Sequence, residues 1–212
     1  MNRPRSGPWG AFLPLVPVLG LVWERFHTYW EAQQPAVTTA ALIGHGLLQG
    51  RPLYSDLWDP HPPALSLSYA LAEALGGDGP YSIFLLGLGT GLGTLAALTL
   101  AGRAYGGPAA GLLAACLWAI VSGDPTVWAN QPLAGSFVNL FAAWALWFLL
   151  EEGKGRPGTR AKLAAGTLLG IASLYQLSVV ALGAAWALAG AFLDRSEGRR
   201  PDPGWAWVAL GA

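Results

Sequence analysis

Long apolar stretches dominate this chain of 212 residues, and they restrict the folds that it can adopt more than any other feature. A helix needs about 20 mostly apolar residues to cross a bilayer. Six stretches approach this length: 9–24, 80–101, 107–123, 132–150, 162–177 and 179–193. Only 11% of the residues are charged, whereas soluble domains carry roughly a quarter. The sequence therefore predicts an all-α, polytopic transmembrane protein rather than a soluble globule.

Two shorter helices are predicted between the first two spans, within a long loop at 25–79. Residues 36–49 place apolar side chains on one face at helical spacing. Residues 64–75 follow the prolines 62–63, at a position where proline is tolerated. Both helices are shorter and more polar than the spans, as expected of helices at the membrane surface. Loops of this length are usually functional.

The basic residues predict the orientation of the chain in the cell membrane. Short cytoplasmic loops are enriched in Lys and Arg. If the N-terminus is cytoplasmic, the inner loops carry Arg3, Arg5, Arg103, Lys154, Arg156, Arg160, Lys162, Arg195, Arg199 and Arg200. Only Arg25 and Arg51 then lie outside. We therefore expect a multi-pass protein with a cytoplasmic N-terminus and an external loop at 25–79.

The same rule decides how the apolar region at 163–193 folds. One long helix would place the arginines that follow it outside the cell, whereas two helices with a turn near Tyr175, Gln176 and Ser178 return them to the cytoplasm. The sequence therefore favours a hairpin. A further apolar stretch opens at Trp205 and stops at residue 212. Because this is too short to cross a bilayer, we expect residues 1–212 to be one transmembrane domain truncated at its C-terminal end.

Polar side chains gather in the connection between the two surface helices, at 50–63. The segment GRPLYSDLWDPHPP contains Arg51, Tyr54, Asp56, Asp59 and His61 beside prolines that restrict the backbone. One interpretation is a simple turn, in which the aspartates cap backbone amides and the histidine is solvated. The other is a functional site on a stiffened loop.

The motifs GRPLYSD at 50–56 and WDPHPP at 58–63 resemble the first external loop of membrane glycosyltransferases of the GT-C class. The similar branch contains the protein O-mannosyltransferases and the lipid A aminoarabinose transferase, and is glycosyltransferase family 39-like. The layout of one span, two surface helices and then further spans is also similar, over most of 9–193. The chain is then the N-terminal portion of such an enzyme.

This resemblance implies transfer of a sugar from a polyprenyl-phosphate donor to an acceptor at the outer face of the membrane. A carboxylate would act as general base and take the proton of the acceptor hydroxyl. Cationic or hydrogen-bonding groups would stabilise the departing phosphate. The partners that it implies are the lipid-linked donor and the membrane lipid, and protein partners are not indicated.

The resemblance also implies roles for individual residues of the loop. His61 stands where relatives often carry Lys, so it is the best match for contact with the phosphate, with Arg51 and Tyr54 as neighbours. A charged histidine needs a carboxylate such as Asp59 close by. The predicted substrate-binding residues of the loop are therefore Arg51, Tyr54 and His61.

The position expected for the catalytic carboxylate differs from the family pattern. Relatives carry an Asp or an Asp-Glu pair shortly before the glycine that corresponds to Gly50, and residues 34–37 contain no acid here. Glu31 is the nearest acid, and Asp56 and Asp59 are the alternatives, so these three are the predicted catalytic residues. Glu31 also suits a membrane-interface residue among Trp and Tyr.

Two further positions keep the capacity for hydrogen bonding but lose a charge. Gln131 stands where relatives commonly carry an acid, and Gln176 stands where they often carry Lys. Both amides are predicted to contact the substrate. These substitutions indicate either a divergent branch with altered donor handling or a protein that has lost catalysis.

Two other classes of function stay open: a transporter or flippase subunit, and a non-catalytic membrane partner. A transporter places polar or charged residues within its spans, and these spans hold almost none. A nucleic-acid partner is excluded because basic and acidic residues balance at 12 each. The polar cluster in the external loop therefore favours chemistry at the surface over a transport path.

No metal ligands are predicted, although a divalent metal cofactor stays open. The three histidines are too far apart in the sequence for a zinc motif. Asp56 and Asp59 would bind a divalent ion only with ligands from elsewhere. The single cysteine, Cys116, lies in an apolar stretch and supports neither a disulfide nor a metal site.

Overall fold

The computed structural model describes residues 12–124, 126–127, 129–151 and 157–211. Its elements are α1 (Leu15–His27), the 3-10 turn η2 (Thr28–Trp30), α2 (Pro35–Leu48), α3 (Ala64–Gly76), α4 (Pro80–Gly123), α5 (Ala134–Glu151), α6 (Thr159–Ser173), α7 (Val179–Ser196) and α8 (Trp205–Gly211). The described residues contain no strand, only an isolated bridge between Leu53 and Leu57. The prediction of an all-α fold is confirmed.

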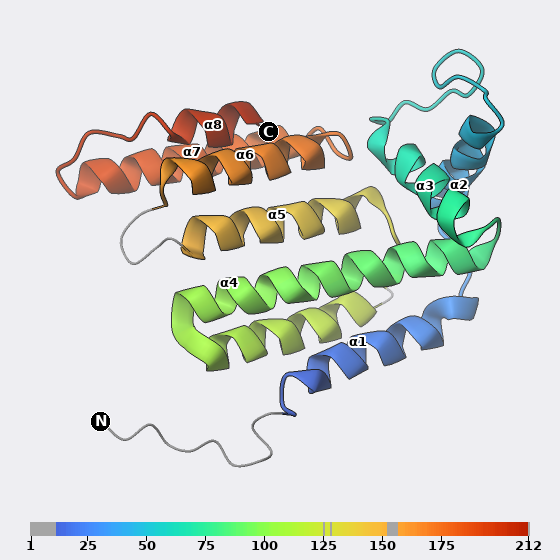
Figure 1. The fold of residues 1–212 in the computed structure, drawn as a ribbon, viewed down its shortest axis with the longest axis horizontal. Helices are drawn as coiled ribbons and strands as arrows, with labels where there is room; N and C mark the ends of the chain where they lie inside the picture. The colour runs from blue at the N-terminus through green and yellow to red at the C-terminus, as the bar shows by residue number, and fades with distance from the viewer. Residues whose placement is uncertain (1–11, 125, 128, 152–156, 212) are drawn as a thin grey trace.

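Helix α4 is a hairpin of two arms, which correspond to the predicted helices at 80–101 and 107–123. The 44-residue element is interrupted at Gly106 and Gly107, and the φ of Gly107 is 83°, a value that favours glycine. Pro108 follows, and its ring nitrogen has no hydrogen to donate to the helical ladder. The arms then run back along each other, and the Trp118 indole N–H donates to the Gly91 carbonyl at 3.1 Å (Figure 1).

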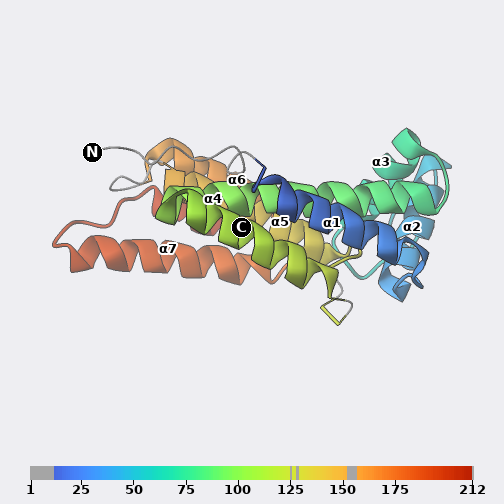
Figure 2. The ribbon, with the colours of Figure 1, turned by 90° about the horizontal axis from the view of Figure 1, so that it is seen from below.

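The longer helices form one elongated bundle, with α2 and α3 gathered at one end. In Figures 1 and 2, α1, α4, α5, α6 and α7 run along a common direction. Neighbours pack in the order α1, α4, α5, α6, and α8 covers both α6 and α7. This contact is close, because a Cβ atom on Gly190 would overlap the Trp205 ring.

Three of the described helices, α4, α5 and α7, are long and apolar enough to cross a membrane. Only 22% of the 18 residues of α5 are buried inside the protein. In α7, Leu188 and Phe192 are 72% and 70% exposed. Apolar area left in water costs roughly 25 cal/mol per Å². These faces therefore suit a lipid environment. With 13 and 15 residues, α1 and α6 are shorter than the three candidate spans.

The helices predicted at 36–49 and 64–75 are present as α2 and α3, and they cross at very short range. A Cβ atom on Gly44 would lie only 2.7 Å from the Ala70 backbone nitrogen, so glycine lets the two backbones meet. Tyr69 of α3 is buried, and its hydroxyl donates to the Pro132 carbonyl at 3.0 Å. This bond ties the helix pair to the segment that leads into α5.

The turn between α6 and α7 lies where the hairpin interpretation placed it. Helix α6 ends at Ser173 and α7 begins at Val179. The Ala64 backbone N–H at the start of α3 donates to the Leu174 carbonyl of this turn at 3.2 Å. The turn therefore lies beside the end of the α2–α3 loop, as Figure 1 shows.

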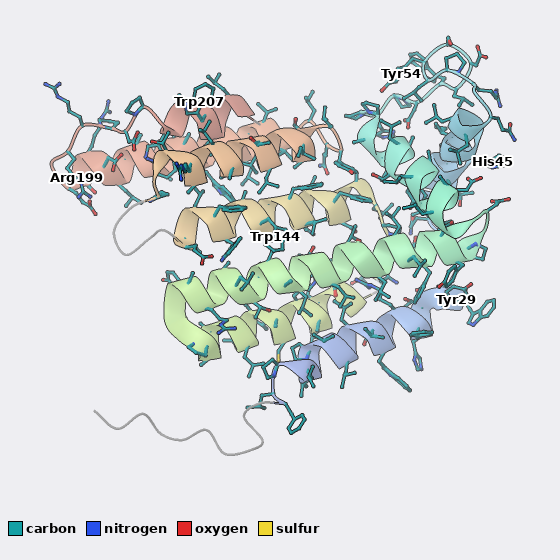
Figure 3. All side chains as sticks on the ribbon, viewed as in Figure 1. Tyr29, His45, Tyr54, Trp144, Arg199 and Trp207 are labelled. Atoms are coloured by element: carbon teal, nitrogen blue, oxygen red, sulfur yellow. The ribbon has the colours of Figure 1, made fainter. Side chains whose placement is uncertain are left out.

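The basic residues are divided between the two ends of the bundle. Arg25 and Arg51 lie at the end that carries α2 and α3. At the opposite end, near the Gly106–Gly107 turn and the termini of α6 and α7, lie Arg103, Arg160, Lys162, Arg195, Arg199 and Arg200. Arg199 is labelled there in Figure 3. Arg3, Arg5, Lys154 and Arg156 fall outside the described residues.

Candidate functional site

The α2–α3 loop is folded on itself by hydrogen bonds between its own residues. The Tyr54 N–H donates to the Leu57 carbonyl at 2.7 Å, and the Tyr54 hydroxyl donates to the His61 carbonyl at 3.0 Å. Tyr54 has a φ of 70°, which is uncommon for a residue other than glycine and marks a constrained backbone. The Arg51 guanidinium donates to the backbone carbonyl of Asp56 at 3.3 Å. The loop thus presents its polar groups on a defined backbone.

Asp59 and His61 form the centre of this loop. The buried carboxylate of Asp59 accepts hydrogen bonds from the His61 backbone N–H at 2.9 Å and from its Nδ1 at 2.7 Å. The Ser66 hydroxyl donates to the other carboxylate oxygen at 3.3 Å. The His61 side chain is 72% exposed. Asp59 therefore caps a turn, as the simple interpretation expected, and also fixes the ring so that Nε2 is directed away from the carboxylate.

An apolar groove runs beside the same end of the molecule. Its volume is about 440 Å³, and it lies between α3, α4 and α5, with Leu71, Leu85 and Phe141 among its lining residues. Its lining includes the hydroxyl pair of Ser68 and Tyr175, 2.7 Å apart. Ser68 lies one helical turn from the start of α3, and therefore close along the chain to the loop motif.

Glu31 and Gln131 belong to a second polar group, which is separate from the loop. The Glu31 carboxylate accepts from the Asn130 side-chain amide at 3.1 Å. The Gln131 side chain accepts from the Gln34 backbone N–H at 2.8 Å and donates to the Ala32 carbonyl at 3.2 Å. The side-chain amides of Asn130 and Gln131 thus hold the extended segment at 31–34 against the start of α5.

A small polar cavity lies beside this second group. Its volume is about 30 Å³, which is above the roughly 10–15 Å³ that a cavity needs to hold one water molecule. Among the described residues, three buried polar atoms have no hydrogen-bond partner, and all three belong to residues that line this cavity: Arg25 Nε, Gln33 Oε1 and Asn130 Oδ1. The other two guanidinium nitrogens of Arg25 donate to the Ser122 and Ala129 carbonyls. One donor and two acceptors are the set that a single buried water can satisfy.

The structure does not bring all the predicted site residues together. Arg51, Tyr54, Asp56, Asp59 and His61 share the loop, and Gln176 is exposed in the adjacent α6–α7 turn. Asp56 is also exposed.

Glu31 lies at the other end of α2, as the labels on Tyr29 and Tyr54 indicate in Figure 3. Helix α2 has 14 residues, so its length is about 21 Å. Helix α2 begins at Pro35, so Glu31 precedes it and lies apart from the loop that carries Asp56 and Asp59.

Sequence reasoning missed one cluster, formed by His45, Glu73 and Asp78. His45 Nδ1 and a carboxylate oxygen of Glu73 are 2.6 Å apart. The hydrogen bond to Glu73 raises the pKa of His45 above its ordinary value of 6.5. Among the described residues this is the one group of three His, Cys, Asp or Glu side chains close enough to share a metal ion. His45 lies 28 residues before Glu73 in the sequence, so no local motif indicated the cluster.

Asp56 and Asp59 do not form such a group within the part of the chain that the structure describes. The loop and the second polar group therefore have different chemistry: a histidine held by a carboxylate in the first, and amides with one carboxylate in the second. Comparisons of the chain with protein-family models, with curated proteins and with solved structures found no match.

Proposed function

We propose that this chain belongs to an integral membrane glycosyltransferase that moves a sugar from a polyprenyl-phosphate donor to an acceptor hydroxyl at the external face of the cell membrane. The observation that carries the proposal is the Asp59–His61 pair, in which a buried carboxylate holds an exposed imidazole at 2.7 Å. It lies in a proline-rich loop beside an apolar groove of about 440 Å³. A donor of this class needs both a site for phosphate and a path for its lipid.

The division of charge supports the membrane orientation. The apolar bodies of α4, α5 and α7 span the space between the two ends of the bundle. The end that carries most of the described basic residues faces the cytoplasm, because positive charge is retained on that side. Helices α2 and α3 and their loop then lie outside, at the level of the lipid headgroups.

The groove between α3, α4 and α5 accommodates the polyprenyl chain of the donor. Its lining is mainly apolar, and its Ser68–Tyr175 hydroxyl pair lies near the start of α3. A lipid chain in this groove would place its phosphate at the end of the molecule where the loop lies. There the guanidinium of Arg51, which stays charged at any physiological pH, and the imidazole of His61 interact with the phosphate.

The reaction forms a bond between the acceptor oxygen and C1 of the sugar and breaks the bond between C1 and the phosphate oxygen. The polyprenyl phosphate departs with the bonding electrons, and a carboxylate takes the proton of the acceptor hydroxyl. Asp56 is the exposed carboxylate in the same loop, so we assign it as the base. Asp59 is a positioning residue for His61, because its oxygens are already engaged by His61 and Ser66.

The decisive experiment measures transfer from a radiolabelled polyprenyl-phosphate sugar by the purified full chain in liposomes. Asp56→Asn abolishes transfer, because the amide keeps the shape but cannot accept the proton. Glu31→Gln, at the other end of α2, retains it. Activity that survives Asp56→Asn but is lost in Glu31→Gln would place the base in the second polar group instead.

A non-catalytic membrane partner is the second candidate. It is favoured by the second polar group, in which Gln131 bonds the backbone at Ala32 and Gln34 and no acid stands at 34–37. If the folded protein shows no donor-dependent transfer at all, this candidate is favoured over the glycosyltransferase.

A transporter is less well supported, because polar side chains in the α4 arms are engaged by their own helix. Thr90, Thr94 and Thr99 each donate to a carbonyl three or four residues earlier. These three threonines therefore do not line a polar path through α4.

A further inference from the structure

We infer that His45, Glu73 and Asp78 form a binding site for a divalent transition-metal cation, independent of the proposed transfer reaction. Each residue offers one ligand atom, and the three atoms lie within 4.8 Å of one another. His45 comes from α2, Glu73 from α3 and Asp78 from the turn that leads into α4. The site thus joins α2 to the C-terminal end of α3 and the turn that follows it.

The packing of α2 on α3 places the first two ligands. Gly44 meets the backbone of α3 at Ala70, and His45 and Glu73 lie one and three residues beyond this crossing point. Their side chains therefore meet, with Nδ1 of His45 2.6 Å from the Glu73 carboxylate. His45 is labelled on α2 beside α3 in Figure 3.

Two glycines place the third ligand. Gly77 and Gly79 flank Asp78, and their φ values are 82° and 123°, a region that side chains with a Cβ atom rarely adopt. The chain therefore reverses sharply after α3 and returns Asp78 toward Glu73. Since Asp78 is exposed, its side chain can close on a cation without moving a packed element.

The ligand set suits Zn²⁺ and related cations. One imidazole nitrogen and two carboxylate oxygens are ligands that Zn²⁺ accepts at about 2.0–2.2 Å. The two carboxylates also balance the charge of a divalent cation. Without a cation, the His45–Glu73 hydrogen bond joins two of the three ligands directly.

Gln49 supplies the outer support that a metal-bound histidine needs. Its side-chain amide nitrogen lies 2.7 Å from Nε2 of His45. An amide can present either its nitrogen or its oxygen. With the oxygen toward the ring, Gln49 accepts a hydrogen bond from the Nε2–H of His45, and the Nδ1 lone pair is left for the cation, as with outer-shell partners of metal-bound histidines.

The site opens onto a cavity that provides room for a further ligand. The cavity has a volume of about 460 Å³, and His45, Glu73 and Asp78 contribute to its wall together with Gln33, Thr38 and Tyr69. Three protein ligands leave one position of a tetrahedral cation open, as in catalytic zinc sites. A water molecule or a small anion in the cavity can occupy that position.

The test is a calorimetric titration of the full chain in detergent micelles with ZnCl₂, after removal of metals by a chelator. Cys116→Ala serves as the background, because a thiol can bind Zn²⁺ by itself. We expect one Zn²⁺ per chain. Asp78→Asn and Glu73→Gln should each weaken binding by at least about tenfold, in line with the loss of a metal contact.

His61→Ala is the matched control, because its imidazole is 2.7 Å from the Asp59 carboxylate but has no third ligand among the described residues. It should bind Zn²⁺ like the background protein. Far-ultraviolet circular dichroism checks that each variant keeps its helices, and Asp78→Asn is the mildest because Asp78 is exposed in a turn. No saturable binding by the background protein, or equal affinity after Asp78→Asn, would overturn the site.

Discussion

The side-chain oxygen of Gln131 accepts a hydrogen bond from the backbone N–H of Gln34 at 2.8 Å, although the two residues are 97 positions apart. The resemblance noted in the sequence predicts acids at 34–37 and at 131, and this chain carries none at these positions. The structure brings them into contact, so the two departures from the family pattern belong to one place in the molecule. At this place the Gln131 side chain binds the backbone at Ala32 and Gln34.

Gln131→Leu should lower the free energy of unfolding by about 1–3 kcal/mol, because it removes the acceptor of the Gln34 N–H and the donor to the Ala32 carbonyl. Thermal unfolding in detergent, followed by circular dichroism, measures this loss. Gln176→Leu is the matched control, since Gln176 is exposed and such changes usually stay within about 0.5 kcal/mol. Equal effects of the two substitutions would contradict a structural role for Gln131.

His61→Ala should reduce transfer from the lipid-linked donor by about tenfold to a hundredfold, the loss expected for one charge-assisted contact to phosphate. His61→Lys should retain more activity, because lysine restores a cation. The measurement is kcat/KM for the donor in liposomes. If both variants lose the same activity, His61 is a turn residue without a role at the phosphate.

The proposed orientation predicts which positions an impermeant thiol reagent reaches in intact cells. In a Cys116→Ala background, a cysteine at Ser55 should react, whereas cysteines at Thr159 and Ser196 should not. All three positions are exposed on the protein, so only the membrane distinguishes them. Labelling at Thr159 from outside, with Ser55 protected, would reverse the orientation.

The docking of α8 on α6 should weaken in acid. The ammonium group of the buried Lys162 pairs with Asp202, and this hydrogen bond holds the pKa of Asp202 below its ordinary value of 3.8. A carboxyl whose pKa is lowered by folding contributes stability above pH 3.8, and this contribution is lost as the pH falls through the folded pKa.

Asp202→Asn should therefore unfold at a lower temperature than the unaltered protein at pH 7, and the difference should shrink as the pH approaches 3. Thermal unfolding over this pH range measures it. Asp124→Asn is the control for acid effects in general, since the pKa of Asp124 is lowered by its hydrogen bonds to Thr126, far along the chain from α8. A constant difference between Asp202→Asn and the unaltered protein at every pH would exclude the ion pair as its cause.

The sequence by itself determined the helices. Long apolar stretches predict α5 and α7 within two or three residues of their observed ends, and both arms of α4. The glycines at 106–107 and the polar turn after Ser173 mark the breaks. Hydrophobicity and backbone preference act over short distances along the chain, so a single sequence carries this information.

Only the tertiary structure decided which polar groups meet. It separated Glu31 from the α2–α3 loop by the length of α2, joined Gln131 to Gln34, and brought His45, Glu73 and Asp78 together. The last of these relationships depends on how closely α2 and α3 approach, as Gly44 allows at Ala70. That distance is set by packing between residues that are remote in the sequence, and the local pattern of apolar residues does not predict it.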